Sequence, residues 1–314
     1  MAVGDLITAA RYNNLQSRLA TILGNGTGLS GYGQAVTSTQ VAGSNTQLVA
    51  ASDMEDLHTD MVKCRQHQVG SAPTEITIPV TGDTIAEETS DNPNGATKGY
   101  ADYEDLMTTI ENDKLLIALS QSTLTTALQS SRTTPWNGVV THTVTFTFTS
   151  ADARRHFFNS GGEIRFSASL TGGSGSKDTD WATMLTNMGT IKFNYTQTSA
   201  TGTGSGSAIG NYDLTTSYQQ IFIKGGSGVY AENDYNIAAR APSATQIQFK
   251  IEFRDDDAGD QRPGDSGGSD GISIPGPGED ENVGGTLSST VQTFRASGSF
   301  VDVAAPTGGN NTTL

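Results

Sequence analysis

Strict alternation of polar and apolar residues marks residues 246–254, which read Gln-Ile-Gln-Phe-Lys-Ile-Glu-Phe-Arg. Successive side chains of a strand point to opposite faces, so this period predicts a strand with one buried and one solvated face. Comparable patterns occur in residues 140–148, 164–170, 191–195, 217–224, 235–241 and 286–303. The carboxyl-terminal part is therefore predicted to be an antiparallel β-sandwich with short helical insertions near residues 151–158 and 178–188.

Before about Ser131 the apolar residues recur at helical spacing instead. This spacing predicts helices over residues 5–23, 45–67 and 98–130. In the last of these, apolar residues return every seven positions, which is compatible with a short coiled coil. Lys114 and Gln121 interrupt the complementary positions, so one amphipathic helix packed on its own domain remains the alternative. The residues predicted to serve oligomerisation or attachment are Tyr12, Leu15, Leu19, Ile22, Tyr103, Ile110, Ile117 and Leu124.

These patterns together predict an α+β chain in which a helical arm precedes the sandwich. Residues 1–131 form the helical and extended attachment and oligomerisation region, and residues 132–138 form a hinge. Residues 139–303 form the β-sandwich domain, which contains an acidic Gly/Pro-rich loop at residues 255–285. Residues 304–314 are expected to be a flexible tail.

A separate Gly/Ser/Thr-rich stretch, residues 24–43, follows the first predicted helix. It is predicted to be extended, and its Tyr32 and Val36 are expected to be available for docking on a neighbour.

Composition limits the partners that the chain can have. The 314 residues carry 18 Lys and Arg against 33 Asp and Glu, a formal charge of −15. Such a charge repels a phosphate backbone and an anionic membrane surface, so nucleic acid is not expected as a partner. No run approaches the ~20 apolar residues of a spanning helix, so membrane insertion is not expected either. The amino terminus has no basic and apolar leader, so no cleaved secretion signal is expected. Hydrophobic residues make up only 34% of the chain, which suggests the hypothesis that partner subunits supply part of its stability.

Two motifs resemble catalytic or cofactor-binding signatures without their structural context. Residues 264–268 read Gly-Asp-Ser-Gly-Gly, as around a protease nucleophile, but the serine lies in a polar loop instead of a strand–turn–helix. His142 lies among threonines on a predicted strand and has no carboxylate beside it in sequence. Residues 26–31 match Gly-x-Gly-x-x-Gly, yet they follow a helix and precede none. No enzymatic activity, catalytic residue or cofactor is therefore predicted.

Metal and sugar sites are weakly indicated. Cys64 and His67 have Cys-x-x-His spacing and His58 lies nearby, but Cys64 falls on the apolar face of a predicted helix and a fourth zinc ligand is missing. The acidic residues of the 255–285 loop do not follow an EF-hand spacing, so calcium binding stays an open alternative without a predicted site. Trp136, Trp181 and the tyrosines are candidates for sugar stacking, although nothing in the sequence brings them together.

Two segments resemble virion proteins of tailed phages, especially the contractile-tailed phages of marine cyanobacteria. The first is Val3-Gly4-Asp5-Leu6-Ile7-Thr8-Ala9-Ala10-Arg11-Tyr12-Asn13 with Gly31-Tyr32-Gly33-Gln34. The second is Arg155-His156-Phe157-Phe158-Asn159-Ser160-Gly161-Gly162-Glu163-Ile164-Arg165-Phe166, followed by Asp180-Trp181 and Met188-Gly189-Thr190-Ile191. The acidic loop lies outside the similarity.

The resemblance implies a non-enzymatic structural subunit of a tail, neck, baseplate or fibre. Such a subunit is assembled in the cytoplasm of the bacterial host and is then found in the virion. Its expected partners are further copies of itself, with a trimer favoured, and other virion proteins. The alternative is a receptor- or glycan-binding module of the adsorption apparatus, in which the sandwich grips a glycan on the host surface.

Overall fold

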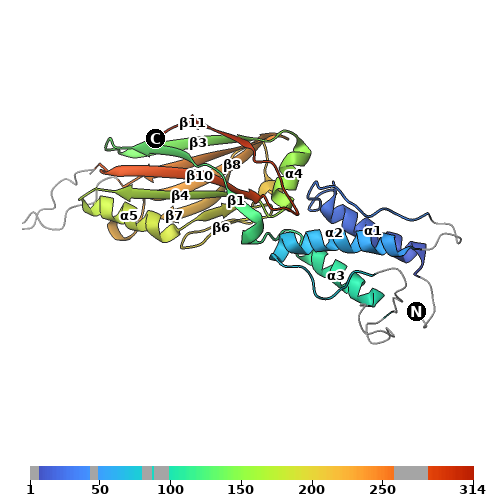
Figure 1. Cartoon of the computed structure of the whole chain (residues 1–314). Coiled ribbons are helices and arrows are strands. Elements are labelled where there is room, and N and C mark those ends of the chain that lie inside the picture. The colour runs from blue at the N-terminus through green and yellow to red at the C-terminus, as the bar shows by residue number, and fades with distance from the viewer. Residues whose placement is uncertain (1–6, 43–48, 80–86, 88–98, 258–281) are drawn as a thin grey trace, which may run out of the picture. The chain divides into compact units, whose positions relative to one another are not determined.

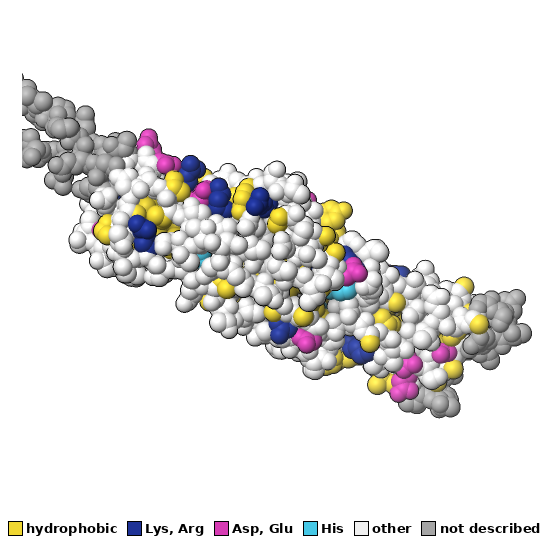
Figure 2. All heavy atoms as spheres, turned by 90° about the horizontal axis from the view of Figure 1, so that it is seen from above, with side chains coloured by type: hydrophobic (Ala, Val, Ile, Leu, Met, Phe, Trp, Pro, Cys, Tyr) yellow, Lys and Arg dark blue, Asp and Glu magenta, His cyan; other side chains and the backbone are white. Residues whose placement is uncertain are grey.

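The computed structural model describes residues 7–42, 49–79, 87, 99–257 and 282–314 (Figure 1 and Figure 2). The chain divides into two compact units. The helical unit comprises residues 1–125, 149–162 and 294–305. The sandwich unit comprises residues 126–148, 163–293 and 306–314. The helical unit is therefore completed by two segments that come from far later in the sequence.

In the helical unit, α1 (Ala9–Leu23), α2 (Ala51–Val69) and α3 (Tyr100–Asn112) pack on one another. Thr8 caps α1, since its hydroxyl accepts from the amide of Arg11 at 3.3 Å. The same unit contains α4 (Ala151–Asn159), a short 3-10 turn, η2 (Leu119–Gln121), and β1 (Ser122–Leu124). Its buried apolar side chains include Tyr12, Leu15, Leu19, Ile22, Met54, Leu57, Met61, Cys64, Tyr103, Leu106, Met107, Ile110, Phe157 and Phe158.

The long third helix and its coiled coil are not confirmed, because α3 ends at Asn112. Leu116 then donates its amide to the carbonyl of Asp113 at 2.8 Å, which turns the chain, and Ala118 donates to the carbonyl of His67 at 2.9 Å. Leu124 lies in β1, opposite Phe294 near the end of a later strand. Tertiary pairing thus overrides the seven-residue period in a stretch rich in β-branched threonine.

Two antiparallel sheets form the sandwich unit, as predicted. One sheet has the order β10–β4–β5–β6, with β2 also paired to β10. Within the helical unit, β1 pairs with residues 294–296, the end of β10 that belongs to that unit. The other sheet has the order β11–β3–β9–β8–β7. The bounds are β2 (Leu128–Arg132), β3 (Gly138–Thr147), β4 (Glu163–Thr171), β5 (Ile191–Phe193), β6 (Thr198–Ala200), β7 (Gln219–Gly225), β8 (Asp234–Ser243), β9 (Gln246–Asp255), β10 (Thr286–Ala296) and β11 (Thr307–Thr312). The remaining elements are α5 (Ser176–Met188), η3 (Asn211–Asp213) and η4 (Gly228–Tyr230).

Aromatic side chains fill the space between the two sheets. Phe249 of β9 meets the ring of Phe166 of β4 at 5.0 Å and that of Phe193 of β5 at 5.2 Å. Both contacts are edge-to-face, the arrangement that aromatic quadrupoles favour. The alternating stretch of residues 246–254 therefore buries its odd-numbered residues between the sheets.

At both edges of the sandwich, the two sheets are linked to each other. At one edge, Asn310 Nδ2 of β11 donates to the carbonyl of Gln129 at 3.0 Å, and the amide of Leu314 donates to the hydroxyl of Ser130 at 2.7 Å. At the other edge, residues 205–207 form bridges with both β6 and β7. Residues 307–312, predicted from the sequence to be part of a flexible tail, thus pair with β3 and join the two sheets. Such closure protects strand edges from unwanted pairing.

Candidate functional site

The strongest candidate site is the loop that follows α1 in the helical unit. Its chain turns back on the helix end, because Tyr32 and Gln34 donate their amides to the carbonyls of Ile22 and Leu23, both at 2.9 Å. Gly31 and Gly33 have φ values of 106° and 69°, which favour glycine. These two glycines lie in residues 31–34, part of the first segment on which the expected resemblance rests.

Side chains of α4 bind the carbonyl groups of this loop. Arg155 Nη1 donates to the carbonyl of Ser30 at 2.7 Å, and Asn159 Nδ2 donates to the same oxygen at 2.9 Å. His156 Nε2 lies 3.0 Å from the carbonyl of Asn25, which can only accept, so this contact is a hydrogen bond when Nε2 carries the proton. All three side chains come from residues 155–166, the second segment on which the expected resemblance rests. The carbonyls that these side chains contact belong to Asn25 and Ser30, which come just before residues 31–34 in the same unit.

The close approach of the loop to α4 depends on Gly33. A Cβ atom placed on Gly33 would lie 2.3 Å from His156 Nδ1, whereas one on Gly28 would meet no atom within 4 Å. Both glycines have positive φ values, 69° and 54°, so the backbone penalty of a substitution is similar at the two positions. Only the substitution at Gly33 also forces the histidine away from the loop.

We expect Gly33→Ala to lower the free energy of unfolding of the helical unit by roughly 2–3 kcal/mol, through backbone strain and steric overlap. The matched control Gly28→Ala should cost about 1–2 kcal/mol, from backbone strain alone. Urea denaturation followed by hydrogen exchange in α1 and α4 measures both effects. Equal losses in the two variants would contradict the packing described for His156.

Beneath this loop lies a buried polar network. Tyr32 donates its hydroxyl to the carbonyl of Lys114 at 2.8 Å, and Gln68 Nε2 donates to the hydroxyl of Tyr32 at 3.0 Å. His67 Nε2 lies 3.1 Å from the carbonyl of Ser160, so this nitrogen carries a proton. Tyr32 is thus buried in its own unit, which differs from the expectation that it docks on a neighbour.

The surroundings of Cys64 and His67 disfavour a zinc site. Burial raises the pKa of the Cys64 thiol, which disfavours the thiolate form that binds metals. His67 uses Nε2 for the Ser160 carbonyl. Within the described ranges, no group of three or more His, Cys, Asp or Glu side chains is arranged to hold a metal ion.

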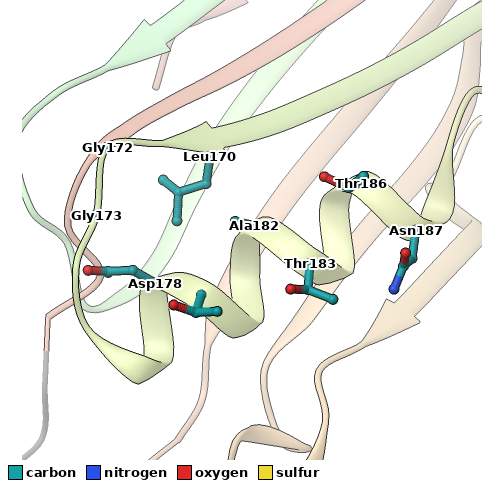
Figure 3. A pocket seen from close by; sticks show the side chains of 9 residues that line it. Leu170, Gly172, Gly173, Asp178, Ala182, Thr183, Thr186 and Asn187 are labelled. Carbon is teal, nitrogen blue, oxygen red and sulfur yellow. The ribbon is translucent and has the colours of Figure 1, made fainter.

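A second candidate is a hollow of about 340 Å³ along α5 in the sandwich unit (Figure 3). Thr183, Thr186 and Asn187 of α5 line it, together with Leu170 of β4. The carboxylate of Asp178 also lines it but already accepts from the amides of Gly175 at 2.9 Å and Gly284 at 2.6 Å. The remaining polar side chains are hydroxyls and an amide, which can form hydrogen bonds but supply no acid or base.

All eight residues predicted to mediate association belong to the helical unit, and most of them are buried in it. Six of them are buried in its core: Tyr12, Leu15, Leu19, Ile22, Tyr103 and Ile110. Ile117 is half-buried against Gly161, and Leu124 is exposed. Their role in association stays a prediction, and the exposed positions are the ones able to meet another chain without unfolding.

The tryptophans, His142 and the Gly-Asp-Ser-Gly-Gly motif were also considered as functional candidates from the sequence. Trp136 and Trp181 pack edge-to-face at 5.1 Å, and both are buried, so neither is placed to stack on a sugar. His142 is buried and contacts the hydroxyl of Ser289 at 2.9 Å and Asn310 Oδ1 at 3.0 Å. The Gly-Asp-Ser-Gly-Gly motif at residues 264–268 lies outside the described residues, as does most of the acidic loop.

No protein-family model, curated protein or solved structure matches the chain. In the part of the chain that the structure describes, no helix is both long and apolar enough to cross a membrane.

Proposed function

We propose that the chain is a non-enzymatic virion structural protein of a tailed phage, an oligomeric fibre, tail or neck connector subunit. The observation that supports this proposal is the contact between α4 and the glycine-rich loop. Arg155 and Asn159 of one resembling segment bind the loop that leads into the other. One segment of the proposed resemblance therefore packs on the residue directly before the other.

Attachment is assigned to the helical unit because large apolar side chains are exposed there. Leu119 is 80% exposed, and Val69, Leu116 and Leu124 are also exposed. Burying apolar area in a contact with another chain is favourable by about 25 cal/mol per Å². The closed sandwich then serves as the stiff projecting module.

Particle composition tests this function directly. Purified particles of a phage that encodes the chain should contain it in stoichiometric amounts by mass spectrometry. Complementation with Leu119→Asp should reduce its incorporation, whereas Val229→Asp, a matched change at an exposed position of the sandwich unit, should not. Finding the chain in infected cells but not in purified particles would refute the proposal.

One observation favours the glycan-binding alternative. Tyr212 is 67% exposed, and its ring stacks on that of Tyr195 at 5.7 Å with an interplanar angle of 21°. An exposed, supported ring of this kind offers a face to a sugar.

If the sandwich unit binds host glycan, Tyr212→Ala in the full chain should lower the affinity for host cells roughly tenfold, because a stacking contact is lost. Val229→Ala, at another exposed position of the same unit, should leave binding unchanged. Flow cytometry with labelled protein measures both. Equal binding by wild type and Tyr212→Ala would remove this ring from the alternative.

A further inference from the structure

A lysine is buried between two aspartates in the sandwich unit. Lys177, the second residue of α5, is 1% exposed, and Asp255 and Asp257 are buried with it. Its Nζ lies 3.1 Å from Oδ1 and 3.2 Å from Oδ2 of Asp255. It also lies 3.2 Å from Oδ2 of Asp257.

This cluster lies beside aromatic side chains of the core. Trp181 is one turn beyond Lys177 on α5 and packs against Trp136 and Phe253. Asp255 lies opposite Gly138 in the pairing of β3 with β9, so the facing residue has no side chain. Charges taken out of water into such surroundings carry a desolvation cost that an ion pair only partly repays.

The position of Nζ is suited to bond formation. Because it is nearly equidistant from both oxygens of Asp255, it lies close to the plane that bisects the carboxylate and contains Cγ. Reacting atoms in a near-attack arrangement lie about 3–3.5 Å apart. Low polarity favours the neutral amine and the protonated carboxyl over the charged pair, and these are the forms needed for attack.

We propose that Lys177 and Asp255 form an intramolecular isopeptide bond. The lone pair of the neutral Nζ attacks Cγ of the protonated Asp255 side chain and forms the C–N bond. Asp257 accepts a proton from the nitrogen and returns it to the departing hydroxyl, so the C–O bond breaks and water leaves. Ammonium and carboxylate are thereby converted to one amide and one water, with no oxidant, reductant or co-reactant.

Asp257 is held in place for this role. Its backbone amide donates to Oδ1 of Asn233 at 3.0 Å, and its carboxylate reaches the same Nζ as Asp255. The resulting amide would join the start of α5 to the end of β9 and leave no ammonium at this point of the core. The proposal does not depend on a phage origin of the chain.

The intact mass of the purified full chain tests the proposal. Wild type should be lighter than its sequence predicts by the mass of one water, and a tryptic digest should contain one branched peptide linking Lys177 to Asp255. Lys177→Arg and Asp255→Ala should show their full sequence masses. Lys250→Arg, a matched change at a lysine paired with Glu252, should retain the loss of water.

Two further results distinguish the isopeptide bond from other causes of the loss of one water. Asp257→Asn should have its full mass although Lys177 and Asp255 are both present. A succinimide also loses one water, but it opens at mildly alkaline pH and joins no two peptides. A full wild-type mass, or a water loss without the branched peptide, would overturn the proposal.

Discussion

Replacing Asp60 by alanine is expected to lower the free energy of unfolding of the helical unit by roughly 3–4 kcal/mol. Asp60 is completely buried on α2. Its Oδ2 accepts from the amides of Thr37 at 2.9 Å and Ser38 at 2.7 Å, and from the hydroxyl of Ser38 at 2.9 Å. These charge-assisted bonds hold Thr37 and Ser38 against α2. Without the carboxylate, their donors lose their acceptor.

Urea denaturation measures the free energy of unfolding of the variant, and hydrogen exchange measures the protection of individual amides. The amides of Thr37 and Ser38 should lose protection first in Asp60→Ala. Glu55→Ala, at an exposed position on the same helix, should change the free energy of unfolding by less than about 0.5 kcal/mol. Unchanged protection of the two amides in Asp60→Ala would show that other contacts hold the segment.

The sandwich could be predicted well because its signal is local. The alternation from Ile247 to Phe253 correctly predicts which residues are buried. The buried odd-numbered positions continue to Asp255. The third helix was predicted too long, because its seven-residue period could not reveal the pairing of β1 with β10, a strand from far later in the chain. A local hydrophobic period carries no information about strands that pair from distant parts of the chain.

The candidate sites were harder to predict for the same reason. Nothing near residues 25–33 indicates that Arg155 and Asn159 bind their carbonyls. The cluster at Lys177 was missed, because the helix predicted over residues 178–188 begins after this lysine, whereas the observed α5 begins at Ser176 and buries it. A charged residue on a buried face requires a partner, and Asp255 occupies the equivalent position on its strand.

Lowering the pH should destabilise the helical unit through His67. Its Nε2 contacts the Ser160 carbonyl, while Nδ1 is buried and has no partner among the described residues. Burial therefore lowers the pKa of His67 from 6.5 to about 4. Between these values the unfolded chain binds the proton and the folded chain does not, so stability rises with pH.

We expect about 3 kcal/mol of the stability present at pH 7 to be lost as the pH falls from about 6.5 to about 4. Burial also lowers the pKa of His58, which adds a loss of the same sign. His67→Gln should therefore flatten the pH dependence without abolishing it. Because Trp136 and Trp181 both lie in the sandwich unit, hydrogen exchange in α2 is the appropriate measurement. An equally steep dependence in His67→Gln would show that a different group titrates, since glutamine cannot take up the proton that the buried imidazole excludes.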